Sequence, residues 1–145
     1  PYFVPDSGTV TALQLAGLRG VDVRLLLTER SDNRVADLAA LAYVPQMAAA
    51  GVRMFLYRGG FMHQKCFVVD DALAGVGTAN FDNRSFRLNF ELTMLVRDAG
   101  FVHEVAEMLR RDLMRAVLVD PAAERRRVWH HQLLVRLARL TAPVQ

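Results

Sequence analysis

Cysteine and long apolar runs are scarce in this sequence of 145 residues. The only cysteine, Cys66, excludes an internal disulfide and any metal site built from several thiolates. No apolar run approaches the roughly 20 residues that a transmembrane helix needs, so we expect no membrane-spanning segment in this chain. Hydrophobic residues nevertheless make up 52% of the sequence, which excludes a disordered tail and predicts a folded core.

Lysine is the scarcest charged residue. Of the 18 basic residues, 17 are arginine and only Lys65 is lysine. An ammonium is a compact point charge, whereas a guanidinium is a planar fork, so a site that needs the former resists replacement by arginine. Lys65 follows His63 by two residues, which suggests that the two act together. The net charge of +3 favours anionic partners without identifying them.

Strand-like and helix-like patterns alternate along the chain. This alternation predicts a single α/β domain over residues 1–145, with a mixed β-sheet covered by helices on both faces. We expect strands near residues 2–4, 21–27, 52–57, 62–69, 74–76 and 92–96. We expect helices over residues 7–20, 33–51 with a break at Pro45, 101–119 and 123–140.

His63 and Lys65 fall on the strand expected over residues 62–69, where alternate side chains share a face. A neutral imidazole is a nucleophile or a proton carrier near neutral pH. An ammonium beside it would stabilise the oxygens of a phosphoryl group. Asp70 lies an odd number of positions from both residues, which favours a structural role for its carboxylate.

A second group of candidates follows this strand. Asn80 can donate an amide N–H to the same phosphoryl oxygens. Gly77 and Thr78 let the backbone pass close to a bound group. Glu91 is the candidate carboxylate for orienting the imidazole of His63. Phosphoryl transfer needs mainly positioning and charge stabilisation, so we expect this set to act without a metal ion or another cofactor.

The pattern of His63, Lys65 and Asp70, followed by Gly77-Thr78-x-Asn80, resembles the HKD motif of the phospholipase D superfamily. The run from Asn80 to Glu91 resembles the bacterial cardiolipin synthase branch in particular. The opening residues, the Arg19–Arg24 segment and the ending also resemble that branch. The resemblance implies a phospholipase D-like sandwich.

This resemblance also implies roles for the residues. Members build one active site from two HKD motifs; one histidine forms a phosphohistidine, and the other acts as general acid and base. His63 matches the second motif's histidine, so the acid–base role is expected for it. The implied catalytic residues are His63, Lys65 and Asp70. Within this set, Asp70 would hold the backbone of the motif. The implied phosphate-binding residues are His63, Lys65, Thr78 and Asn80, with Glu91 orienting His63.

The implied reaction transfers a phosphatidyl group from phosphatidylglycerol to a second phosphatidylglycerol, giving cardiolipin and glycerol. The implied setting is the surface of the bacterial cytoplasmic membrane. The chain departs from the family in carrying only one HKD motif. Three hypotheses follow: the chain is the C-terminal half of a longer enzyme, one copy of a symmetric dimer, or an inactive half. The alternative activity is that of a homodimeric phosphodiesterase or nuclease, although nucleic acid is the less expected partner.

Overall fold

The computed structural model describes residues 2–126 and 134–135. Its strands form three small sheets, with the orders β1-β6, β2-β3-β8 and β4-β5-β7. The strands are β1 (Phe3–Val4), β2 (Arg24–Thr28), β3 (Arg53–Tyr57), β4 (Cys66–Val69), β5 (Leu73–Gly77), β6 (Phe81–Asp82), β7 (Thr93–Val96) and β8 (Ala116–Leu118). The helices are α1 (Ser7–Leu18), α2 (Arg34–Leu41), α3 (Val44–Ala49), α4 (Asn83–Arg87), α5 (Ala99–Met114) and α6 (Pro121–Arg126).

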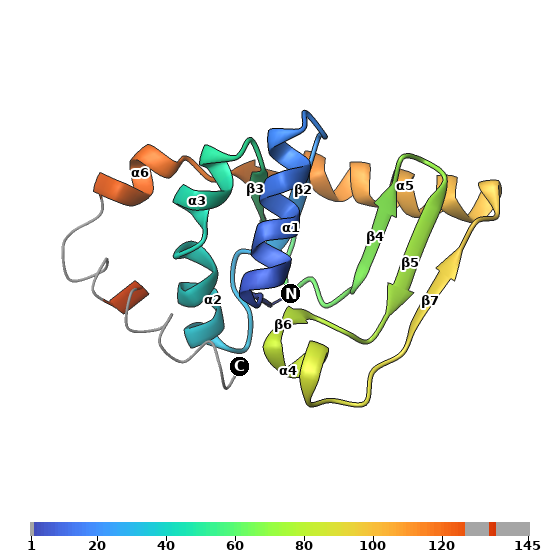
Figure 1. Ribbon diagram of the computed structural model, residues 1–145, viewed down its shortest axis with the longest axis horizontal. Coiled ribbons are helices and arrows are strands. Elements are labelled where there is room, and N and C mark those ends of the chain that lie inside the picture. The colour runs from blue at the N-terminus through green and yellow to red at the C-terminus, as the bar shows by residue number, and fades with distance from the viewer. Residues whose placement is uncertain (1, 127–133, 136–145) are drawn as a thin grey trace.

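The sheet of β2, β3 and β8 carries the main hydrophobic core. β2 and β3 run parallel, and β8 joins β3 in the antiparallel direction. Buried Met54 of β3 packs with Met47 of α3 and Phe3 of β1, and with partly buried Leu13 of α1. Figure 1 shows α1 in front of this sheet and α5 passing behind it, so helices cover both of its faces.

The antiparallel sheet of β4, β5 and β7 has one covered face. Its inner face packs on α5, where Ala74 of β5 and Val102 of α5 are fully buried. The outer face carries Phe67 and Val69 of β4 and Leu95 of β7, which are 37%, 47% and 63% exposed. No described helix lies in front of this face (Figure 1).

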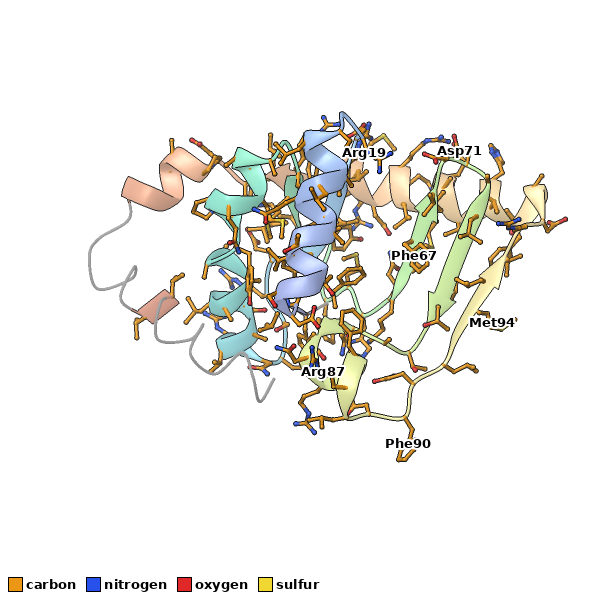
Figure 2. All side chains as sticks on the ribbon, viewed as in Figure 1. Arg19, Phe67, Asp71, Arg87, Phe90 and Met94 are labelled. Atoms are coloured by element: carbon orange, nitrogen blue, oxygen red, sulfur yellow. The ribbon has the colours of Figure 1, made fainter. Side chains whose placement is uncertain are left out.

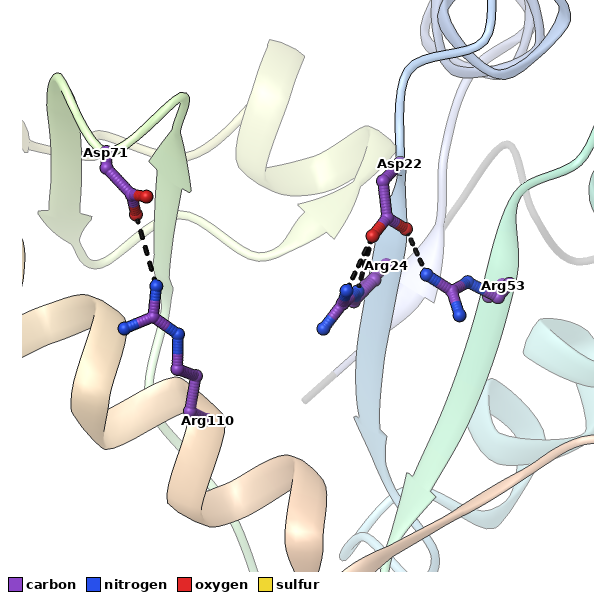
Figure 3. Close-up of polar contacts among 5 residues, drawn as sticks. All are labelled: Asp22, Arg24, Arg53, Asp71 and Arg110. Carbon is purple, nitrogen blue, oxygen red and sulfur yellow. Dashed lines mark hydrogen bonds and ion pairs between the residues drawn. The ribbon is translucent and has the colours of Figure 1, made fainter.

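Ion pairs fix the two larger sheets at their ends (Figure 3). Asp71, in the turn between β4 and β5, lies 3.6 Å from Arg110 of α5. Asp22 binds both Arg24 and Arg53, which are partners across β2 and β3. These two guanidinium groups lower the pKa of Asp22 to about 2. The contacts are exposed and therefore matter more for register than for stability.

The third sheet joins the start of the chain to its middle. β1 pairs in parallel with β6, so that Phe3 stacks on Phe81 with ring centroids 6.2 Å apart. Asp6 caps α1 by accepting from the Thr9 N–H, and it also binds Arg87 of α4 at 2.9 Å. The opening segment is thereby held beside α4.

The structure confirms the α/β class and revises several elements. The helix expected over residues 33–51 forms as α2 and α3, which break just before Pro45 as predicted. The helix expected over residues 101–119 was wrong at its end, because α5 stops at Met114 and β8 follows. β6 and α4 were not predicted, and the single expected sheet is divided into three. Most of the helix expected over residues 123–140 lies outside the described residues.

Candidate active site

His63 and Lys65 lie in the segment between β3 and β4. The strand expected over residues 62–69 begins only at Cys66, so the prediction that both side chains share a strand face was wrong. Instead the chain bends, and the Lys65 Nζ donates a 2.8 Å hydrogen bond to the backbone carbonyl of His63. The imidazole of His63 is exposed and packs against Phe61, with ring centroids 5.1 Å apart. It is therefore accessible to a substrate.

Backbone pairing brings three segments to one end of the β4-β5-β7 sheet. The Gly77 N–H donates to the Lys65 carbonyl at 3.0 Å, which extends the pairing of β4 and β5 beyond β4. The Thr78 N–H donates to the Leu92 carbonyl at 2.9 Å, and the Leu92 N–H donates back to the Thr78 hydroxyl at 3.0 Å. Lys65, Thr78 and the residue before Leu92, Glu91, therefore gather at this end.

Glu91 is held by its neighbours in this cluster. The Thr78 hydroxyl donates to one carboxylate oxygen, and the Asn89 Nδ2 donates to the other at 3.0 Å. These hydrogen bonds, that of Thr78 first, lower the pKa of Glu91. Within residues 2–126 no hydrogen bond joins Glu91 to His63, so the orienting role stays a prediction.

Asn80 stands at the entry to α4. Its backbone N–H donates to the Ser85 hydroxyl at 3.0 Å, while Asp82 caps α4 by accepting from the Ser85 N–H at 2.7 Å. The side-chain Oδ1 of Asn80 is buried and has no hydrogen-bond partner among the described residues. A buried amide group without a partner is costly, which is typical of a group that a ligand completes.

Asp70 does not join this cluster. It lies with Asp71 in the turn after β4, where both residues have a φ of 51° and the Ala72 N–H donates to the Val69 carbonyl. Two consecutive positive φ angles are what a type I′ turn requires, and aspartate tolerates them. Five residues of extended chain, roughly 16 Å, separate Asp70 from Lys65. The predicted role in holding the motif's backbone is untested.

Asp32 and Tyr2 belong to the site, although sequence analysis gave Asp32 no role there. The Tyr2 hydroxyl donates to Asp32. Burial, followed by this carboxylate, raises the pKa of Tyr2 to about 12. The hydrogen bond from the Tyr2 hydroxyl lowers the pKa of Asp32, and a smaller electrostatic contribution from His63 acts in the same direction. Asp32 therefore lies within the electrostatic reach of the candidate catalytic imidazole.

A topological signal could have placed Asp32 near His63. Loops that follow neighbouring parallel strands meet at the same edge of a sheet. Asp32 follows β2 and His63 follows β3, which are parallel neighbours. The two loops touch where the Thr28 hydroxyl lies 3.4 Å from the Gly60 carbonyl. The parallel pairing was not assigned from the sequence, so this proximity was missed.

Three carboxylates act electrostatically on the ammonium of Lys65. Burial lowers the pKa of Lys65, while the carboxylates of Glu91, Asp32 and Asp82 act in the opposite direction. An ammonium and an imidazole in this setting can hold a phosphoryl oxygen and move a proton.

Comparisons with known proteins agree with the resemblance seen in the sequence. The family described as "Cardiolipin synthase, PLD-like domain" matches residues 1–113. The chain is 49% identical to cardiolipin synthase A of Pseudomonas syringae pv. syringae and 46% identical to that of Pseudomonas putida. Each match covers 99% of this chain and 30% of the relative. The chain thus spans about 30% of the length of the curated relatives it matches.

Solved structures share the fold at low sequence identity. Nuc, a phospholipase D family member from Salmonella typhimurium, has a TM-score of 0.69 and 22% identity, with 81% of this chain and 76% of Nuc covered. NucT from Helicobacter pylori has a TM-score of 0.63 and 20% identity, with 81% and 78% covered. These two likenesses establish the fold.

Proposed function

Because this chain belongs to the family of cardiolipin synthases with a phospholipase D-like domain, we propose that it supplies one half of a phosphatidyltransferase active site. The reaction takes a phosphatidyl group from phosphatidylglycerol to a second phosphatidylglycerol and releases glycerol. The observation that carries this proposal is the gathering of Lys65, Thr78 and Glu91 at one end of the β4-β5-β7 sheet, beside His63 and Asn80.

The proposed reaction has two steps. In the first, a histidine nitrogen of the partner HKD motif, the one that does not contain His63, attacks phosphorus. The bond from phosphorus to the glycerol oxygen breaks, and His63 gives that oxygen a proton. In the second, His63 takes a proton from a hydroxyl of the incoming phosphatidylglycerol. The new bond from phosphorus to oxygen forms as the bond from phosphorus to nitrogen breaks. Atoms and charge balance without an added co-reactant.

Two side chains are suited to the charge that develops on phosphorus. Among the described residues, the Lys65 ammonium bonds only to the His63 backbone carbonyl, so it can turn to a phosphoryl oxygen. The side-chain N–H groups of Asn80 can donate to a phosphoryl oxygen. Glu91 accepts hydrogen bonds from Thr78 and Asn89 and so keeps both side chains in place.

The uncovered face of the β4-β5-β7 sheet supports pairing with a second HKD motif. Phe67, Val69 and Leu95 expose an apolar surface on the same sheet whose end carries the site. A partner seated there would bring its own basic residues close to the three carboxylates around Lys65. The partner is the remainder of a longer chain or a second copy, because the resemblance implies a site built from two HKD motifs.

Apolar side chains beside Glu91 favour a lipid over a nucleic acid as substrate. Leu88, Phe90 and Leu92 alternate along the segment that contains Glu91, and all three are exposed. Phe90 is fully exposed and points away from the fold (Figure 2). A surface of this kind suits acyl chains, so we place substrate binding at a membrane surface. Within the described residues, no helix has both the length and the apolar character to cross a bilayer.

The proposal is tested with the purified protein and vesicles of radiolabelled phosphatidylglycerol, in a buffer containing a chelator. We expect labelled cardiolipin and released glycerol from the wild type and neither from His63→Ala. The matched control is His103→Ala, because His103 is an exposed histidine of α5 outside the site. Unchanged turnover in His63→Ala contradicts the proposal. Cleavage of DNA with no change to the lipid would assign the alternative nuclease activity.

A further inference from the structure

A pocket lined by both polar and apolar side chains shares Asn80 with the proposed site but includes neither His63 nor Lys65. Its volume is about 260 Å³, several times the roughly 30 Å³ that one water molecule occupies in the liquid. It is therefore large enough for a small polar headgroup. Its polar lining residues are Tyr2, Asn33, Asn80, Asp82, Arg84 and Asn89.

We propose that this pocket binds the headgroup of the incoming alcohol, with the glycerol hydroxyls on the side of Asn80 and Asp82 and the acceptor lipid's own phosphate on Arg84. The inference rests on the proposed function, because it assigns the acceptor to a place beside the same site. The ligand class is a glycerol phosphodiester.

The lining matches hydroxyl groups, each of which can donate one hydrogen bond and accept others. The Asn80 Oδ1 is buried without a partner among the described residues, and a ligand hydroxyl would supply the missing donor. Asn33 uses its side-chain oxygen to cap α2, which leaves its amide N–H groups to donate. Asp82 uses one carboxylate oxygen to cap α4, which leaves the other to accept.

Arg84 supplies the charge that a phosphodiester needs. It is exposed on α4, lines the pocket, and forms no ion pair with any described residue. Its neighbour on the same helix, Arg87, is already paired with Asp6. Because Lys65 does not line the pocket, the phosphate expected at Arg84 is distinct from the one that reacts at Lys65.

The pocket is connected to the reacting groups through shared residues. Asn80 lines it and stands in the proposed phosphate-binding set. Asn89 lines it and donates to Glu91 at 3.0 Å. A headgroup seated there would lie next to Glu91 and Asn80 of the proposed site.

Arg84 should distinguish the two steps of the reaction. The leaving glycerol carries no phosphate, whereas the incoming phosphatidylglycerol carries one. Loss of the guanidinium should therefore weaken the second step when the acceptor is a lipid. It should leave the first step, and transfer to water or to free glycerol, unchanged.

The test compares Arg84→Gln with Arg19→Gln, which removes the same charge from the exposed far end of α1 (Figure 2). Binding of deacylated headgroup, glycerophosphoglycerol, is measured by titration calorimetry, with inorganic phosphate and glycerol as separate probes. We expect Arg84→Gln to weaken binding of the headgroup about tenfold, the usual effect of losing a charge-assisted hydrogen bond. Binding by Arg19→Gln should equal that of the wild type.

Product analysis supplies a second readout with labelled phosphatidylglycerol. In Arg84→Gln the ratio of cardiolipin to phosphatidic acid should fall about tenfold, while the consumption of donor phosphatidylglycerol stays unchanged. Arg84→Lys should restore part of the cardiolipin-to-phosphatidic-acid ratio. Identical behaviour of Arg84→Gln and Arg19→Gln overturns the inference, as does headgroup binding that depends on Lys65 but not on Arg84. Binding does not require turnover, so an inactive protein whose headgroup binding depends on Arg84 would refute only the proposed function.

Discussion

The ammonium of Lys65 donates a 2.8 Å hydrogen bond to the backbone carbonyl of His63. This contact closes a bend just before β4, so the two motif residues meet through the backbone of one and the side chain of the other. A carbonyl is a weaker partner for an ammonium than a phosphoryl oxygen. In the proposed mechanism, a phosphoryl oxygen of the substrate takes the place of this carbonyl.

Replacement of Lys65 by arginine should inactivate the enzyme although the charge is retained. A planar guanidinium cannot occupy the place of a point charge within the bend at His63. We expect the kcat for cardiolipin formation to fall by about 10²- to 10³-fold, as when one oxyanion-binding donor is lost. Arg58→Lys, a conservative change at an exposed residue paired with Glu29, is the control. Full activity in Lys65→Arg would refute the assigned role.

Replacement of Thr78 by valine should raise the pKa of Glu91. The Thr78 hydroxyl is the largest cause of the lowered pKa, and Asn89 supplies a smaller part that remains. Titration of the Glu91 carboxyl carbon by NMR measures the shift. Thr93→Val, at an exposed position on β7, should leave the titration unchanged. A curve for Thr78→Val that overlies the wild type would show that the hydroxyl does not hold the carboxylate.

Replacement of Gly77 by alanine should damage both the fold and the site. An added Cβ would lie 2.3 Å from the Leu92 carbonyl oxygen, so β5 and β7 would have to separate. We expect a lower urea midpoint and loss of turnover, because the same pairing places Thr78 beside Glu91. Gly8→Ala is the matched control, since its Cβ would meet only ordinary contacts in α1. Wild-type stability in Gly77→Ala would contradict the close approach.

Acid should remove a stabilising contribution of Asp6. The Thr9 backbone N–H first, and Arg87 second, lower the pKa of Asp6 to about 2 from an ordinary value of 3.8. A carboxyl whose pKa is lower in the folded state stabilises the fold above its unfolded pKa, and that contribution is lost as the pH falls. The window is therefore pH 3.8 to about 2.

Urea unfolding between pH 5 and pH 2 measures this contribution. Asp6→Asn should reduce the pH dependence in that window and leave the part contributed by other carboxyls such as Asp22, although asparagine still caps α1. Arg87→Gln should keep most of it, because the Thr9 N–H is the larger cause. Equal loss in the two variants would assign the effect to the ion pair instead.

Local signals in the sequence predicted much of the fold. The alternation of strand-like and helix-like patterns predicted the α/β class, and Pro45 predicted the break that separates α2 from α3. The strands β6 and β8 could not be predicted from the sequence, because they have only two and three residues and so show no hydrophobic periodicity. Their pairing with β1 and β3 depends on contacts between residues far apart in the chain.

The sequence likewise predicted some residues of the candidate site and missed others. The motif spacing pointed to His63, Lys65, Asn80 and Glu91, and three adjoining segments bring these residues to one end of a sheet. The strand face expected to join His63 with Lys65 was wrong, because regular pairing begins only at Cys66. Asp32 lies in a loop 31 residues before His63, and only the parallel pairing of β2 with β3 places it nearby.

The most direct test of the proposed site is a crystal structure of the protein soaked with vanadate, an analogue of a reacting phosphoryl group. The proposed mechanism predicts one vanadate contacted by the imidazole of His63, the Nζ of Lys65 and the side-chain amide of Asn80, with Lys65 released from the His63 carbonyl. Vanadate bound away from these three groups, or an imidazole turned away from it, would contradict the proposal that they act on one phosphorus atom.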